Sequence, residues 1–268
     1  MDELLMSLYT TLYNDLVSLA SVAGISENDL KKYFSPRKIT KSDNILFRLC
    51  SSLQNSSMMR NSIKFNDSSF QCNRKAIGET LLEFNTIKAI EKYNNWKEVY
   101  NVITERVTDK GKGKNKETNW EKYCKGIYDG LQFLNAENGE SKIKRLAGIT
   151  EPTDEDFMEI INISDKIYGL GYALTCDWLK ECGCVWLAKP DGHINSVIMH
   201  ITGDNKIKEN DVVREMFTWA KTIREENIDP DATAYKLDKI IWLLCTGDFY
   251  LDKIRIGREA IYRKIDSI

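Results

Sequence analysis

Proline, histidine and long apolar runs are all scarce in this sequence. The 268 residues include four prolines and two histidines, and strand-like runs of Val, Ile and Thr are few. No run approaches the ~20 apolar residues that a transmembrane helix needs. These absences favour an all-α fold and predict that no segment spans a membrane. With so few histidines we also expect no Cys/His metal site and no cofactor.

The seven cysteines form no recognisable framework. Their number is odd and their spacings match no disulfide pattern. Cys182 and Cys184 are separated by one residue, whereas a zinc knuckle or redox motif has two. The first 16 residues, MDELLMSLYTTLYNDL, are acidic and amphipathic, unlike a signal or transit peptide. We therefore expect reduced thiols in a cytoplasmic protein, which would associate with the nucleoid if it binds DNA.

Hydrophobic residues make up 42% of the chain, as in a folded globular protein. Apolar residues recur at helical spacing from Leu5 to Leu19, from Trp120 to Leu134 and from Ala234 to Leu244. These stripes predict buried helix faces. For the last of these helices, Asp231 is the expected N-cap and Gly247 the expected C-cap. Between the stripes, the Ser- and Asn-rich residues 51–74 predict a loop.

Charge is unevenly distributed along the chain, although the net charge is only −2. Residues 1–30 contain five acidic and no basic side chains, whereas residues 31–75 contain ten Lys and Arg against two Asp. A basic face of this kind can meet phosphates, and it can equally be an ordinary solvated surface. The lysine-rich stretch 109–117 predicts an exposed loop, for which DNA contact and plain solvation both remain open.

Two glycines lie between two expected helices near the middle of the chain. Thr153 and Asp156 resemble a capping box, so the first helix is expected to begin there. The stretch IYGLG, residues 167–171, then forms a short turn, and the second helix is expected to begin near Tyr172. The free N–H groups at that helix start favour an anion such as a phosphate. A plain helix–helix turn also fits this pattern.

An isolated aspartate follows one helix later. Pro190 disfavours helix at Lys189, so the chain is expected to be extended there. Asp191 can then N-cap a helix that continues through His193. Taken alone, this aspartate is equally well an ordinary cap, and His193 is expected to be a packed or capping residue.

Together the hairpin and the aspartate resemble the helix-hairpin-helix DNA glycosylases. In endonuclease III-like members the hairpin reads Leu-Pro-Gly-Val-Gly and the later segment Val-Asp-Thr-His-Ile. Here the two segments read Ile-Tyr-Gly-Leu-Gly (167–171) and Pro-Asp-Gly-His-Ile (190–194), with the same separation. The resemblance covers about 40 residues, 153–194. It implies an all-α fold of two helical lobes flanking a DNA-binding cleft, with a helix-hairpin-helix motif at about 153–182.

The resemblance also implies a division into two lobes. Residues 76–186 would form a helical-barrel lobe that includes the hairpin. Residues 1–75 and 187–268 would form the second lobe, which carries the aspartate. The iron–sulfur cysteines of some members are absent, since only Cys245 lies in the corresponding C-terminal region.

The resemblance implies a role for each residue of the hairpin. Gly169 and Gly171, with Leu170 between them, match the hairpin whose backbone holds a DNA phosphate. Tyr168 replaces the usual proline. Ala173, also expected at the DNA, stands where strand-cleaving members have their Schiff-base lysine, so the covalent route to strand cleavage is missing.

Asp191 matches the family's catalytic aspartate, and Lys189 beside it can add a phosphate contact or remain solvated. Trp178 and Trp186 are expected in the core, although either could stack on an extruded base. The resemblance implies a monofunctional DNA glycosylase that flips out a damaged or modified base and hydrolyses its N-glycosidic bond, leaving an abasic site.

Three interpretations of the chain stay open. Its expected partner is double-stranded DNA with a damaged or modified base, in base excision repair or a related removal of modified bases, and the expected state is a monomer without a membrane partner. The alternative is a non-catalytic helix-hairpin-helix DNA-binding protein, against which the carboxylate of Asp191 argues. A helical protein with a chance match is the third interpretation.

Overall fold

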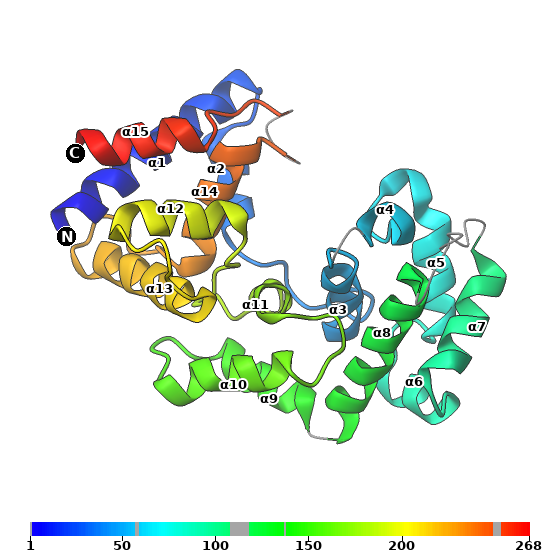
Figure 1. Ribbon diagram of the computed structural model, residues 1–268. Coiled ribbons are helices and arrows are strands. Elements are labelled where there is room, and N and C mark those ends of the chain that lie inside the picture. The colour runs from blue at the N-terminus through cyan, green and yellow to red at the C-terminus, as the bar shows by residue number, and fades with distance from the viewer. Residues whose placement is uncertain (1, 57–58, 108–117, 137, 249–252) are drawn as a thin grey trace. The chain divides into compact units, whose positions relative to one another are not determined.

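Every regular element in the described part of the chain is a helix (Figure 1). The computed structural model describes residues 2–56, 59–107, 118–136, 138–248 and 253–268, so the lysine-rich stretch 109–117 lies outside it. No strand occurs among the described residues, and the expected all-α fold is confirmed. The helices are α1 (Asp2–Val22), α2 (Glu27–Lys31), η1 (Lys32–Phe34), α3 (Ile45–Leu53), α4 (Arg60–Ile63), η2 (Ser68–Phe70), α5 (Gln71–Thr80), α6 (Thr86–Lys92), α7 (Trp96–Arg106), α8 (Asn119–Ala136), α9 (Gly139–Ala147), α10 (Asp154–Ser164), α11 (Tyr172–Glu181), α12 (Gly192–Thr202), α13 (Glu209–Glu225), α14 (Ala234–Thr246) and α15 (Arg258–Ser267).

The chain divides into two units. Met1–Arg37 and Val185–Ile268 form the first, called here the aspartate unit, and Lys38–Cys184 forms the second, called the hairpin unit. The later boundary lies close to the expected one at 186/187. The earlier boundary differs, because residues 38–75 belong with the hairpin and not with the aspartate. The reason is packing: the apolar face of α3 is buried against α8 and α11.

The aspartate unit brings the two ends of the chain together. Helix α1 packs on α13, α14 and α15, and Figure 1 shows it in blue among the yellow-to-red C-terminal helices. Leu8, Leu12 and Leu16 of α1 are fully buried, as their spacing predicts. The C-cap of α14 is Gly247, as expected, but its N-cap is Thr233 and not Asp231.

Helix α8 is central to the hairpin unit, where it contacts α3, α6, α7 and α9. Its predicted stripe from Trp120 to Leu134 is buried. Two glycines on α8 let α3 approach closely, because an added Cβ at Gly130 would lie 2.1 Å from Leu49 and one at Gly126 2.8 Å from Leu53. The expectation that residues 51–74 are mainly loop is partly wrong, because the stretch contains the end of α3, all of α4 and η2, and the start of α5.

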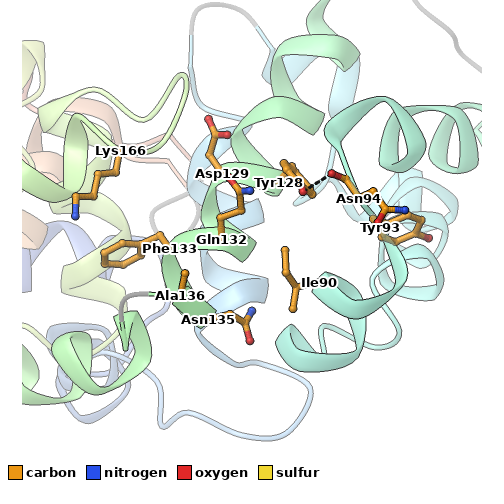
Figure 2. Close-up of a pocket in the computed structure, with 10 residues that line it drawn as sticks. All are labelled: Ile90, Tyr93, Asn94, Tyr128, Asp129, Gln132, Phe133, Asn135, Ala136 and Lys166. Atoms are coloured by element: carbon orange, nitrogen blue, oxygen red, sulfur yellow. Dashed lines mark hydrogen bonds between the residues drawn. The ribbon is translucent and has the colours of Figure 1, made fainter.

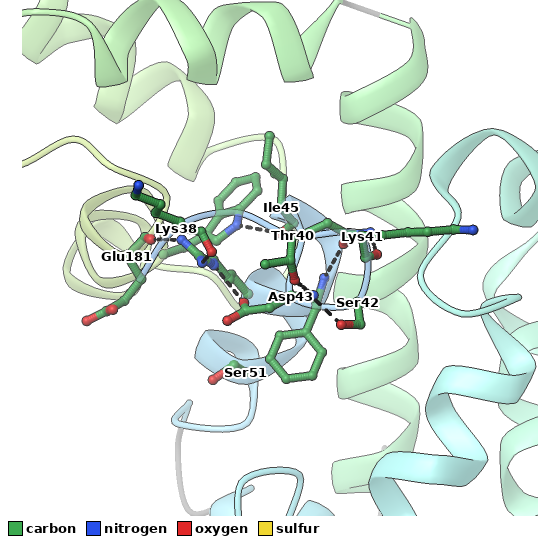
Figure 3. A network of polar contacts seen from close by, with 12 residues as sticks. Lys38, Thr40, Lys41, Ser42, Asp43, Ile45, Ser51 and Glu181 are labelled. Carbon is green, nitrogen blue, oxygen red and sulfur yellow. Dashed lines mark hydrogen bonds and ion pairs between the residues drawn. The ribbon is translucent and has the colours of Figure 1, made fainter. Parts of the chain in front are cut away.

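A buried arginine fixes the start of the hairpin unit (Figure 3). Arg48 is only 5% exposed, and its Nε donates to Oδ1 of Asp43 at 2.8 Å. Its other nitrogens donate to the carbonyl oxygens of Glu181 and of Lys38. The segment that opens the unit is therefore tied to the C-terminal end of α11.

Candidate functional site

The two helices that flank the hairpin lie where the sequence predicts them. Helix α10 begins with a reciprocal capping box, in which Thr153 Oγ1 accepts from the Asp156 N–H and Asp156 Oδ2 accepts from the Thr153 N–H. Arg145 also donates to Oδ1 of Asp156 at 2.7 Å. Helix α10 ends at Ser164 and α11 begins at Tyr172, and the two helices pack together.

The hairpin backbone is held by contacts within the turn. Gly169 has φ +77°, a left-handed conformation that glycine adopts without strain. The side chain of Leu170 is fully buried, and its carbonyl accepts from Thr175 Oγ1 at 2.7 Å. Any contact of Leu170 with DNA would therefore use its backbone. Gly171 is the N-cap of α11, and its carbonyl accepts from the N–H groups of Leu174 and Thr175.

Three backbone donors at the hairpin are unused within the described residues. The N–H groups of Gly169, Gly171 and Ala173 find no acceptor there. Gly169 and Gly171 are also exposed. Unpaired N–H groups at the start of a helix, with the positive end of the helix dipole, form an anion-binding arrangement. The hairpin residues named from the sequence thus lie together as a candidate phosphate contact.

Helix α8 supports the hairpin, a feature that sequence reasoning missed. The N–H of Tyr168 donates to Oδ2 of Asp129 at 3.0 Å. Lys125 Nζ lies 5.4 Å from the centre of the Tyr168 ring and 4.7 Å from that of Trp96. Partial burial raises the pKa of Asp129, although the Tyr168 N–H and Lys125 oppose the shift. The only sequence signal was that Lys125 and Asp129 stand one helical turn apart.

Asp191 caps α12 as predicted, and the described residues use only one of its carboxylate oxygens. Oδ1 accepts from the N–H groups of His193, at 2.9 Å, and Ile194, at 3.2 Å. No described residue donates a hydrogen bond to Oδ2. The cap therefore fixes the carboxylate, and among the described residues Oδ2 stays available.

Further polar groups surround Asp191 within its own unit. Arg258, from α15, donates to the Gly192 carbonyl at 3.3 Å and to Ser196 Oγ at 3.0 Å. Burial raises the pKa of the Cys245 thiol to about 12; Asp191 adds to this and Arg258 opposes it, so Cys245 stays a neutral thiol. Arg258 is 67 residues from Asp191 in sequence, and no motif links them.

Two buried atoms on the first turns of α12 have no hydrogen-bond partner among the described residues, namely Nδ1 of His193 and Oδ1 of Asn195. Leaving such atoms unpaired costs free energy, so a ligand or an ordered water is the expected partner.

The remaining residues named from the sequence, Lys189, Trp178 and Trp186, take part in the packing and hydrogen bonding of the fold. The backbone N–H of Lys189 donates to the buried carboxylate of Asp238 at 2.8 Å, which fixes the extended strip before Asp191. Trp178 and Trp186 are 0% and 2% exposed and belong to the core, as expected.

The hairpin belongs to one unit and Asp191 to the other. In the part of the chain that the structure describes, no group of three or more His, Cys, Asp or Glu could hold a metal ion. Nor does that part contain a helix long and apolar enough to cross a membrane.

Three comparisons with known proteins give no relative. The chain matches no family model, and neither the curated proteins nor the solved structures yield a match to it.

Proposed function

We propose that this chain is a monofunctional DNA glycosylase, which excises a damaged or modified base from double-stranded DNA. The observation that carries the proposal is the Asp191 carboxylate. Two backbone N–H groups hold its Oδ1, while no described residue donates to its Oδ2. A carboxylate that is oriented in advance, with one oxygen available, suits the stabilisation of positive charge that develops on a sugar.

The proposed reaction is hydrolysis of the N-glycosidic bond. The base is first flipped out of the stack, at a cost of a few kcal/mol. As the bond breaks, the sugar acquires oxocarbenium character, which the negative charge of Asp191 stabilises. Oδ2 accepts a proton from the attacking water, whose oxygen bonds to the sugar carbon as the bond to the base breaks. This proton then passes through solvent to the released base, which regenerates the carboxylate. The products are a free base and an abasic site.

The hairpin supplies the hold on DNA in this proposal. The N–H groups of Gly169, Gly171 and Ala173 would donate to one backbone phosphate, which positions the strand without reading its sequence. Asp129 and the close packing of Gly126 against the Tyr168 carbonyl keep the turn in place.

The absence of an amine at Ala173 supports base release without strand cleavage. Lys180 lies seven residues further along α11, but it is only 3% exposed and pairs with Asp177 at 3.8 Å. A buried, paired ammonium cannot take the place of a Schiff-base lysine, since that role needs a neutral amine that reaches the sugar.

The test is a panel of DNA duplexes, each carrying one alkylated, deaminated or oxidised base. Each duplex is incubated with the protein and then treated with alkali, which cleaves abasic sites. Asp191→Asn is the informative variant, because Asn keeps the helix cap but removes the negative charge. Asp67→Asn is its matched control, since Asp67 also caps a helix through an N–H at 2.8 Å but lies in the other unit.

We expect wild type and Asp67→Asn to release a base from at least one duplex. Asp191→Asn should bind that duplex without releasing the base. Equal excision by Asp191→Asn would refute the role of this carboxylate. Strand cleavage without alkali would refute the monofunctional assignment. Binding without excision on every duplex would favour the non-catalytic DNA-binding alternative.

A further inference from the structure

A depression of about 760 Å³ lies on the hairpin unit, close to the hairpin itself. Residues of α8 form much of its lining, together with the end of α6 and Lys166 just before the hairpin. Figure 2 shows Asp129 and Gln132 between Lys166, at the left of the view, and Tyr93, at the right. The volume is in the range of small-molecule sites, about 300–1,000 Å³.

Three aromatic rings form rigid walls around this depression. The Tyr128 hydroxyl donates to the Asn94 carbonyl at 2.6 Å, and the Tyr93 hydroxyl donates to the Thr80 carbonyl at 2.9 Å. Phe133 is 3% exposed and packs edge-on against the buried Trp178. Tyr93 and Phe133 are only 4% and 3% exposed, whereas Tyr128 is half-buried. A flat ligand could therefore stack on the exposed part of the Tyr128 ring, with little loss of side-chain entropy.

Two polar groups on α8 face this aromatic lining. Asp129 uses Oδ2 for the Tyr168 N–H, and its Oδ1 receives no hydrogen bond from any described residue. Gln132 stands three residues later, is exposed, and makes no hydrogen bond within the described part of the chain through its side-chain amide. Together they offer a charged acceptor beside an amide that both donates and accepts.

We infer that this depression binds a nucleotide with an unpaired base. The base would stack on the Tyr128 ring, as bases do on aromatic platforms. Oδ1 of Asp129 would accept from an exocyclic amino group, and the Gln132 amide would pair with the neighbouring edge of the base. Lys166, at the edge of the depression, would place positive charge near the phosphate.

This site takes no part in excision, and its ligand could come from two sources. A free nucleotide would make it a small-molecule site. An unpaired nucleotide within a DNA strand would make it an extension of the hairpin, because Asp129 links the two directly. The chemistry of recognition is the same in both cases, so the two sources are separated by experiment.

The probes are 2-aminopurine deoxynucleoside monophosphate and a single-stranded oligonucleotide with one 2-aminopurine, whose fluorescence falls on stacking. Both are titrated with the full-length protein, and unlabelled dCMP and dTMP then compete. Ala136→Trp would fill the depression, which Ala136 lines, and Gln132→Ala would remove the amide. Gln71→Ala is the matched control, because Gln71 is an exposed helical glutamine that does not line the site.

We expect saturable quenching, weakened at least about tenfold by Ala136→Trp and about threefold by Gln132→Ala, with Gln71→Ala unchanged. Cytosine carries an amino group that thymine lacks, so dCMP should compete about fivefold better than dTMP. Asp129→Asn keeps an acceptor for the Tyr168 N–H but can present an N–H₂ donor to the base, and should abolish this preference. If the fluorescence of the monophosphate is quenched, the ligand is a free nucleotide. If only the fluorescence of the oligonucleotide is quenched, the ligand is a nucleotide within a strand.

Absence of saturable quenching with both probes at millimolar nucleotide would overturn the inference. Binding that Ala136→Trp leaves unchanged would overturn it too, provided that circular dichroism shows the variant to be folded. Asp191→Asn should bind both probes as wild type does. Failure of the glycosylase proposal would therefore leave the nucleotide-binding result unaffected. Failure of nucleotide binding would likewise leave the glycosylase proposal unaffected.

Discussion

The backbone N–H of Tyr168 donates to Oδ2 of Asp129 across 39 residues of sequence, at 3.0 Å. One turn earlier on the same helix, Gly126 lies so close to the Tyr168 carbonyl that an added Cβ would be 2.6 Å from that oxygen. The hairpin thus meets α8 at both backbone groups of Tyr168, through a hydrogen bond to its N–H and close packing at its carbonyl. The position of the hairpin therefore depends on α8, a helix outside the motif that α10, the turn and α11 form.

Alanine at the two glycines of α8 should therefore have unequal effects. The atom nearest to a Cβ at Gly126 is a backbone oxygen, whereas at Gly130 it is the end of the Leu49 side chain, which can rotate. We expect Gly126→Ala to lower the free energy of unfolding by about 1–3 kcal/mol. Gly130→Ala should lower it less, because the Leu49 side chain can move aside, whereas the gain in helix propensity of about 1 kcal/mol is the same at both sites. Urea unfolding measures both, and equal losses would contradict this account.

Gly169 should tolerate alanine poorly for a conformational reason alone. Its φ is +77°, and the nearest atom of a described residue is 3.9 Å from an added Cβ, so no clash with the described residues contributes. Gly169→Ala should cost about 1–2 kcal/mol. Gly169→Asn should cost less, because Asn adopts the left-handed region more readily. Gly171→Ala is the control, since that site has no positive φ and no atom of a described residue lies within 4 Å of an added Cβ. A loss equal to that of Gly169→Ala would disprove the explanation.

Removal of the Arg48 guanidinium should strongly lower the free energy of unfolding. Arg48→Met removes the guanidinium that donates to the Asp43 carboxylate and to two carbonyl oxygens. We expect a loss of about 3–5 kcal/mol in the free energy of unfolding, as for other broken buried pairs. Arg106→Met breaks an exposed pair of 2.8 Å with Glu79, which also pairs with Lys75 at 3.8 Å, and should cost about 0–1 kcal/mol. Chemical denaturation compares the two, and similar values would argue against a structural role for Arg48.

The capping box of α10 should make stability depend on pH in the acid range. Burial opposes ionisation of Asp156, but hydrogen bonds from Arg145 and Thr153 hold its pKa below the usual value. The resulting stability is complete above the unfolded pKa of about 3.9 and is lost as the pH falls through the lower folded pKa.

Asp156→Asn should therefore flatten the fall of unfolding free energy below about pH 4. Glu155→Gln, at an exposed carboxylate in the same helical turn, should leave that fall unchanged. Thermal unfolding between pH 2.5 and 6 tests this pair. A wild-type profile no steeper than that of Asp156→Asn would show that the capping box contributes nothing to the acid dependence.

Local features of this protein could be read from its sequence. The stripes of α1, α8 and α14, the capping box at Thr153 and the cap at Asp191 all appear as predicted. Each depends on residues a few positions apart, so helical periodicity and the needs of helix ends suffice to predict them. The short turn at Gly169 is likewise a local feature that neighbouring residues predict.

Long-range packing decided the remaining features. Residues 38–75 join the hairpin unit because α3 buries its apolar face on α8 and α11. Arg258 reaches the start of α12 and Asp129 reaches Tyr168 across 66 and 39 residues. Such contacts depend on which helix faces bury each other, and a single sequence carries no local signal for that choice.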